Sequence, residues 1–210
     1  MDDVNGTSAA TVFDALGARY EQAFADAPAH RESLRELTAR LAPRSRVLDV
    51  GSGTGRPTAE VLVAAGHEVH GVDVSPVMVE LAARQVPGAS FVHADVRGLA
   101  LAEASFDAVC VYFSLLQMTR AEQGALLARL AVALRPGGLL AVATVPLDVE
   151  GVDAVFMGRP VRVTSFDGPA FTALVAGAGF TVLSDRSVLF TPAHPEATPE
   201  PHLFLLGRRD

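Results

Sequence analysis

The sequence predicts a single α/β unit with a mostly parallel seven-stranded sheet, helices on both faces and an antiparallel hairpin at the C-terminal edge. Two observations lead to this fold class. From Arg46 onward, short apolar runs alternate with helix-like segments, and this alternation is typical of parallel strands joined by helical crossovers. Near the end of the chain, the strand-like runs 180–190 and 202–208 follow each other without an intervening helix, so they are most simply antiparallel neighbours.

The chain before Arg46 predicts a short N-terminal helical cap over 1–45. One face of 11–25 carries an apolar or aromatic residue every four positions, which is the spacing of an amphipathic helix. A second helix is expected over 30–41, and Pro43 ends it because proline disfavours helical backbone in the residue before it. We therefore expect two helices ahead of the sheet.

The remaining residues, 46–210, are expected to form one globular unit. Its first five strands are predicted at 46–50, 68–73, 89–93, 106–112 and 138–145. Its helices are predicted at 55–65, 76–84, 120–134 and 167–178. The segment 146–166 has no clean periodicity and follows the fifth strand, where ligand crevices open in such sheets, so we expect a lid or a substrate-contacting insertion there.

Composition limits the classes of partner. The net charge is −7, and the 17 basic residues, all of them arginine, are scattered rather than clustered, which argues against a nucleic-acid partner. The longest apolar run, 139–147, is far shorter than the ~18 residues that indicate a membrane span. The polar, acidic start lacks the features of a signal peptide, and the single cysteine, Cys110, excludes an internal disulfide. We therefore expect a cytoplasmic protein.

The most informative motif is a glycine turn directly after the first strand. The run 47–55 reads VLDVGSGTG, in which an apolar strand breaks into glycines at every second position. Asp73 lies 22 positions after Gly51, at the end of the second strand. Glycines let the main chain approach a ligand closely, and a strand-end carboxylate accepts hydrogen bonds from ribose hydroxyls. This pattern predicts a site for an adenosine-containing ligand.

The glycine spacing separates two cofactor classes. A nicotinamide dinucleotide site favours a glycine at position 56, which is Arg56 here, and the chain has no lysine for a hydride-transfer relay. The spacing Gly51, Gly53, Gly55 instead resembles the class I S-adenosylmethionine (SAM)-dependent methyltransferases, and in particular small bacterial members. Further stretches resemble the same family in the same order, at 71–75, 91–96, 105–109 and 134–140. The resemblance covers about residues 46–145 and implies a Rossmann-like fold, SAM as cofactor and S-adenosylhomocysteine (SAH) as product.

The resemblance also implies roles for individual residues. Asp73 binds the ribose hydroxyls, Asp95 reaches the adenine amino group, and Val96 supports the adenine ring. Tyr20 lies over the amino-acid end of the cofactor. The full set of cofactor-binding candidates is Tyr20, Asp49, Gly51, Ser52, Gly53, Gly55, Asp73, Val74, Met78, Asp95, Val96, Tyr112 and Gln117.

Several of these residues have a second, structural interpretation. Asp73 could cap the following helix, although Ser75 before Pro76 is an equally suitable N-cap that would leave Asp73 free. Asp95 could cap its own loop. Asp49 could accept hydrogen bonds from loop amides or lie near the cofactor's ammonium group. Core packing is an equal alternative for Tyr112 and Gln117, as it is for Tyr20.

No specific sequence motif is expected for the methyl-transfer step, because transfer from a sulfonium depends mainly on positioning of the reactants and on exclusion of water. The fourth strand leads into VYFS at 111–114, without the Asn/Asp-Pro-Pro-aromatic motif of enzymes that methylate DNA adenine or protein glutamine. We therefore expect methyl transfer to an oxygen or nitrogen of a small molecule, including secondary metabolites. The alternative is a SAM-binding protein with non-methylating activity, such as a cyclase, a decarboxylase or a regulatory protein.

The catalytic residue stays open, and its candidates are His30, His194, Tyr20 and Tyr112. No histidine is recognised at metal-ligand or His–carboxylate dyad spacing, so we predict no metal. A homodimer is expected to complete the pocket, since the cap is short.

Overall fold

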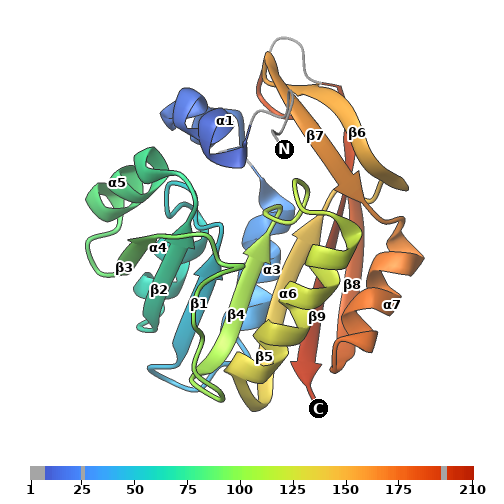
Figure 1. The fold of residues 1–210 in the computed structure, drawn as a ribbon. Helices are drawn as coiled ribbons and strands as arrows, with labels where there is room; N and C mark the ends of the chain where they lie inside the picture. The colour runs from blue at the N-terminus through green and yellow to red at the C-terminus, as the bar shows by residue number, and fades with distance from the viewer. Residues whose placement is uncertain (1–7, 25–26, 195–197) are drawn as a thin grey trace.

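The computed structural model describes residues 8–24, 27–194 and 198–210. Within these ranges, one large sheet consists of β1 (Arg46–Val50), β2 (Glu68–Asp73), β3 (Ser90–His93), β4 (Phe106–Tyr112), β5 (Leu134–Thr144), β8 (Phe180–Phe190) and β9 (Glu200–Arg209). The strand order is β3-β2-β1-β4-β5-β9-β8. The first five strands are parallel, while β9 is antiparallel to both β5 and β8. The predicted fold class is therefore confirmed (Figure 1).

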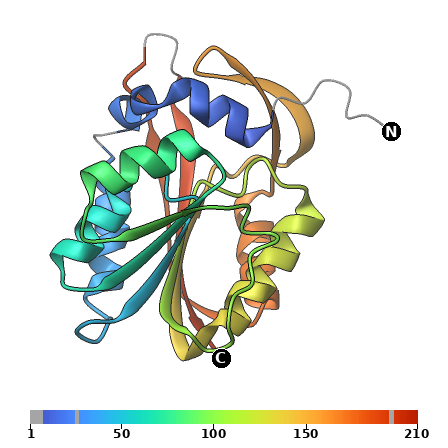
Figure 2. The same cartoon turned by 60° about the vertical axis from the view of Figure 1, so that its left-hand side comes forward.

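Helices cover both faces of this sheet (Figures 1 and 2). One face carries α3 (Pro28–Thr38), α4 (Thr58–Ala64) and α5 (Pro76–Gln85), and the other carries α6 (Arg120–Ala133) and α7 (Gly168–Gly177). The central strand β4 shows how the sequence produces the two layers. Val109 and Val111 pack toward α6 and α7, whereas Ala108 and Cys110 pack toward α3 and α4. The buried stretch 108–111 of β4 is apolar at every position, because successive side chains point to opposite sides and both sides are covered.

The strand order reverses between β1 and β4, which are neighbours in the sheet but not in the sequence. The loops that follow these two strands consequently diverge to opposite faces and leave a crevice at the carboxyl ends of the strands. Ser114, just after β4, donates a hydrogen bond of 2.9 Å from its Oγ to the carbonyl oxygen of Val50, at the end of β1. This bond fixes the two loops together at the base of the crevice.

Two segments far apart in the sequence cover this crevice, and we call them the roof: the helices α1 (Ala9–Leu16) and α2 (Ala18–Phe24), and the antiparallel hairpin of β6 (Val149–Phe156) and β7 (Arg159–Ser165). Figures 1 and 2 show them above the carboxyl edge of the sheet. Val12 and Leu16 of α1 pack with Val161 of β7 in an apolar cluster of their own. The roof therefore has a small core, separate from the two clusters that flank the sheet.

The roof departs from the sequence-based expectations in two places. The helix expected over 11–25 is divided at Gly17, whose backbone (φ 49°, ψ −134°) is a conformation reserved for glycine; Ala25 of that prediction lies outside the described residues. The segment 146–166 forms the β6–β7 hairpin, although no strand was predicted there. Its period-2 pattern is weak because most of β6 is exposed, so neither face of that strand needs to be consistently apolar.

Helix α3 packs against the sheet and is not part of the roof. Leu34 and Leu37 are fully buried, and they share an apolar cluster with Val47 of β1 and Leu62 of α4. The predicted boundary at residue 45 between a cap and the main unit stays a prediction, but the packing of α3 argues for placing it earlier. None of the described helices combines the length and the apolar character needed to cross a membrane.

We predict that Leu34→Ala lowers the free energy of unfolding by about 2–5 kcal/mol, as Leu62→Ala does, because both side chains are fully buried in the same cluster. Urea unfolding followed by circular dichroism measures both losses. Val132→Ala, at a half-exposed position of α6, is the control and changes stability by less than about 0.5 kcal/mol. A small loss for Leu34→Ala would show that α3 detaches before the sheet unfolds.

Candidate functional site

Two connected hollows lie between the carboxyl edge of the sheet and the roof. The inner pocket, about 400 Å³, is lined by the ends of β1, β2 and β4, by α1 and by the β6–β7 hairpin. The outer pocket, about 820 Å³, extends between α3, α4 and β8. Both are lined by Tyr20, Gly53, Tyr112, Phe113 and His202, so these residues stand where the two hollows meet.

The glycine turn forms the floor of the inner pocket, and two of its glycines serve different purposes. Gly51 (φ 69°) allows close packing, because a Cβ there would lie 2.3 Å from the Cβ of Ser114. Gly53 (φ 52°) has no atom within 4 Å of the position that a Cβ would take, so its main chain is bare toward the pocket. A ligand can approach the backbone closely only at a position of the second kind.

Asp73 joins the turn to the second strand. Its Oδ2 accepts a 2.8 Å hydrogen bond from the backbone N–H of Gly53, and its Oδ1 accepts one of 2.8 Å from the N–H of Ser75. Burial raises the pKa of this carboxyl, while these backbone bonds oppose the rise. Each oxygen keeps a further lone pair, so the carboxylate can hold the turn and still accept from a ligand. The N-cap of α5 is Ser75, whose Oγ accepts from the N–H of Met78 at 3.1 Å.

Asp49 is buried beside the turn without a full set of partners. It is 2% exposed, lines the outer pocket, and its Oδ2 has no hydrogen-bond partner among the described residues. Burial, with a smaller contribution from the charge of Asp73, raises its pKa to about 8. The neighbouring Oγ of Ser52 is also buried without a partner. Buried acceptors of this kind are costly unless a ligand supplies the missing donors.

Asp95 has the structural role that sequence analysis left open. Its carboxylate accepts from the backbone N–H of Arg97 at 2.9 Å and from the guanidinium of the same residue at 2.7 Å. The hydrogen bonds from Arg97 lower the pKa of Asp95 and keep it ionised. Asp95 nevertheless lines the inner pocket, together with Val74, Met78, Val96 and Gln117. A contact between Asp95 and an adenine amino group stays a prediction. Gly55, by contrast, is not among the described residues that line either pocket.

The four candidate catalytic residues do not occupy equivalent environments. Burial raises the pKa of Tyr20 to about 12 and that of Tyr112 well above its ordinary value, so both phenols are neutral near pH 7. Burial lowers the pKa of His30 to about 3, and its Nε2 lies 3.1 Å from the Oγ1 of Thr58. So weak a base accepts a proton poorly. His194 is not among the described residues that line the two pockets.

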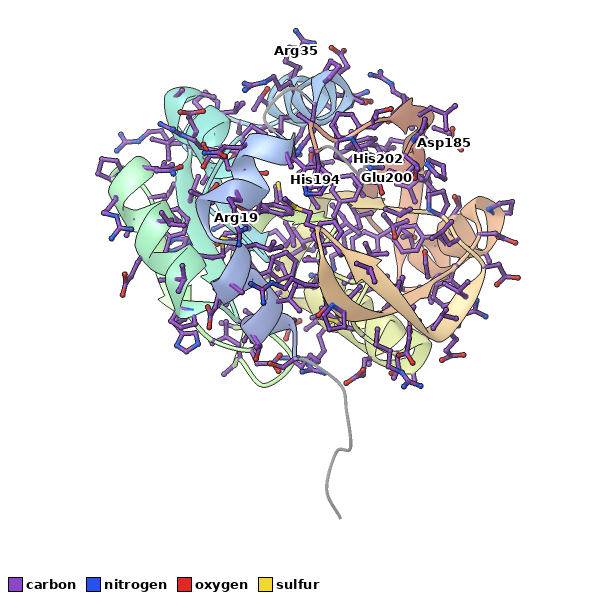
Figure 3. All side chains as sticks on the ribbon, turned by 90° about the horizontal axis from the view of Figure 1, so that it is seen from above. Arg19, Arg35, Asp185, His194, Glu200 and His202 are labelled. Carbon is purple, nitrogen blue, oxygen red and sulfur yellow. The ribbon has the colours of Figure 1, made fainter. Side chains whose placement is uncertain are left out.

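His202, which pairs with a carboxylate in the pocket, is not among the candidates predicted from the sequence. His202 Nε2 lies 2.8 Å from Glu200 Oε1, and a second such pair, His70 with Glu68, lies at 2.7 Å outside the pocket. The expectation that no histidine stands at dyad spacing was therefore wrong. Residues i and i+2 of one strand share a face, and this spacing was the available signal. Figure 3, viewed from above the roof, labels Glu200 and His202 near each other.

No group of three or more His, Cys, Asp or Glu side chains within the described ranges is arranged to hold a metal ion. A metal-free site stays a prediction from the sequence.

The residues present fit SAM, the cofactor that the motif resemblance implies. Gly53 offers bare main chain, Asp73 retains acceptor capacity for ribose hydroxyls, and the unpartnered carboxyl of Asp49 suits a cationic group such as an ammonium. These three features lie along one continuous hollow.

Comparisons with known proteins agree with this fit. A family model described as a methyltransferase domain matches residues 47–138. The O-methyltransferase cnsE of Penicillium expansum is 33% identical over 162 residues, which are 71% of this chain and 57% of that protein. The chain spans about half the length of the first curated relatives that it matches.

Solved structures extend the likeness to the whole chain. The 1,6-didemethyltoxoflavin-N1-methyltransferase of Burkholderia thailandensis, with bound 1,6-didemethyltoxoflavin and SAH, is 27% identical at a TM-score of 0.72, covering 99% of this chain and 93% of that one. The [4+2]-cyclase SpnF matches with a TM-score of 0.74 at 21% identity, and the match covers 99% of this chain and 97% of that one. This similarity shows the fold alone. Because fold, motif spacing and relatives agree, the chain belongs to the class I SAM-dependent methyltransferases, whose cofactor is SAM.

Proposed function

We propose that this protein transfers a methyl group from SAM to an oxygen or nitrogen of a small-molecule acceptor. The observation that carries the proposal is the pair of connected hollows under the roof: Gly53 lines both of them, Asp73 lines the apolar inner pocket, and Asp49 lines the outer pocket. SAM supplies a methyl group already activated on a sulfonium. The task left to the protein is to bind, to orient and to exclude water.

The chain's residues divide these tasks by position. We assign the ribose hydroxyls to Asp73, the close main-chain approach to Gly51, Ser52 and Gly53, and the ammonium to Asp49. The side chains of Val74, Met78 and Val96 line the inner pocket beside Asp95, where they would flank the adenine ring. Tyr20 would cover the amino-acid end, as it lines both hollows.

The aromatic side chains of the roof favour a compact, aromatic acceptor. The ring of Tyr20 lies 5.5 Å from that of Phe13, 5.0 Å from that of Phe24 and 6.3 Å from that of Phe156, between centroids. These rings belong to α1, α2 and β6, so the two segments of the roof meet over the pocket. Aromatic walls of this kind bind flat, largely apolar molecules and keep water from the reacting centre.

The relatives support both acceptor atoms without choosing between them. One is named an O-methyltransferase, and the solved structure most similar in sequence among those described above is named an N1-methyltransferase. The non-methylating alternative rests on fold alone, since the similarity to the cyclase SpnF is only 21% in sequence. The homodimer, the cytoplasmic location and the absence of a nucleic-acid partner stay predictions from the sequence.

The function is tested by incubating the protein with methyl-labelled SAM and a panel of phenols, enols, hydroxylated quinones and aromatic amines. We expect labelled product and an equal amount of SAH with at least one class of acceptor. SAH binding without labelled product from any class would favour the non-methylating alternative.

We predict that Gly53→Ala weakens SAH binding at least about tenfold, because the added methyl group occupies bare main chain in the pocket. Gly137→Ala is the matched control: Gly137 also has a positive φ (77°) and open space around its Cβ position, but it is not among the described residues that line either pocket. Both variants lose about 1–2 kcal/mol of stability from the left-handed backbone. Equal affinities by calorimetry would remove Gly53 from the site.

We predict that Asp49→Asn makes the ligand-free protein more stable at pH 8 and weakens its binding of SAH. With a folded pKa of about 8 and an unfolded one near 4, Asp49 keeps a proton on folding between these values. The wild-type free energy of unfolding therefore falls as pH rises through this window, by up to about 1.4 kcal/mol per pH unit from this group.

The measurement is urea unfolding of both proteins at pH 5 and pH 8, in which the other ionisable groups cancel in the difference. We expect the advantage of Asp49→Asn to grow with pH. A difference that is the same at both pH values would show that Asp49 is ionised in the free protein.

A further inference from the structure

The Glu200–His202 pair stands at the junction of the two hollows. His202 is 3% exposed and lines both the inner and the outer pocket. Its Nε2 faces Glu200 Oε1 at 2.8 Å, which leaves Nδ1 as the nitrogen that can take a proton from another molecule. The two residues share one face of β9, which pairs with β8 at both positions and with β5 from Leu203 onward.

The ring of His202 is held by aromatic packing at the functional edge of the sheet. Its centroid lies 4.5 Å from that of Phe113 and 5.1 Å from that of Phe190. Phe113 directly follows β4 and has a φ of 57°, a left-handed conformation that is an outlier for a bulky residue. Strain of this kind persists where the surroundings impose it, and it concentrates at active sites.

Glu200 places a carboxylate directly against the ring of His202. Among the described titratable groups that line the same pockets, burial keeps Tyr20 of α2, His30 of α3 and Tyr112 of β4 neutral near pH 7. Glu200 is therefore the charge positioned to stabilise an imidazolium, in the way that a carboxylate orients and supports a catalytic histidine.

We propose that His202 is the general base that accepts the proton of a hydroxyl acceptor, and that Glu200 is the residue that positions and stabilises its ring; the proposal rests on the proposed function. The acceptor's O–H bond breaks, its proton goes to Nδ1, and its electron pair forms the new bond to the methyl carbon as the methyl–sulfur bond breaks and leaves its pair on sulfur. The imidazolium then releases the proton to solvent. The acceptor class is a phenol or an enol, whose proton a histidine can remove.

The test uses 4-nitrophenol, whose phenolate is yellow and whose neutral form is not. It is titrated into the protein, with and without SAH, at a pH at which the free probe is mostly neutral. We expect a saturable phenolate band, because His202 takes the probe's proton and the resulting ion pair is retained in the pocket. His202→Gln, which keeps a donor toward Glu200 but has no basic nitrogen, loses the band, and Glu200→Gln reduces it several-fold.

His70→Gln is the matched control, since His70 pairs with Glu68 in the same way but is not among the described residues that line the two pockets. We expect its band to equal that of the wild type. Absence of the band in the wild type, or an undiminished band in His202→Gln, would overturn the assignment of the base. Calorimetry with SAH is run in parallel: lack of SAH binding contradicts the proposed function, and retained SAH binding in His202→Gln shows that a lost band is not due to misfolding.

Discussion

The carboxylate of Asp73 is the interaction on which the site depends. It accepts the N–H of Gly53 on one oxygen and the N–H of Ser75 on the other, and so ties the glycine turn to the start of α5. Ser75 in turn caps α5 and donates a 2.5 Å hydrogen bond to Asp14 of α1. One chain of hydrogen bonds thus runs from the bare main chain of the turn to the roof. A ligand that contacts Asp73 would therefore contact the residue that also positions the wall and the cover of its own pocket.

The strand order of the sheet creates the hollow, and polar side chains lie around its edge. The reversal of strand order between β1 and β4 opens the crevice, and parallel strands buried on both faces hold it in a fixed shape. Polar groups that would be costly inside the sheet are placed where a ligand can satisfy them: Asp49 beside the turn, and His202 near the start of β9. The aromatic roof then closes the crevice from two directions. The edge of the sheet would position a ligand, the polar groups beside it would supply charge, and the aromatic roof would exclude water.

Much of this could be predicted from the sequence, because strong local patterns determine it. The alternation of apolar runs and helices predicts the parallel sheet. The glycine spacing, together with an acid at the end of a strand, predicts the positions of the turn and of Asp73. The hairpin at 149–165 could not be predicted, since an exposed β6 needs no regular apolar face. The Glu200–His202 pair does not follow from the sequence, because the predicted last strand begins at 202, two residues after the observed start, which places Glu200 in the preceding loop. For Asp95 the motif indicates the position, but nothing in the sequence pattern predicts its ion pair with Arg97.

The most direct test of the central claim is the affinity for SAH, measured by calorimetry, of Asp73→Ala beside Asp107→Ala. Asp107 also accepts a backbone N–H, that of Arg46 at 2.7 Å, but lies at the opposite edge of the sheet. The account predicts a roughly 10- to 150-fold loss of affinity for Asp73→Ala, equivalent to about 1.5–3 kcal/mol for hydrogen bonds to a charged group, and little change for Asp107→Ala. Wild-type affinity in a folded Asp73→Ala protein would contradict it.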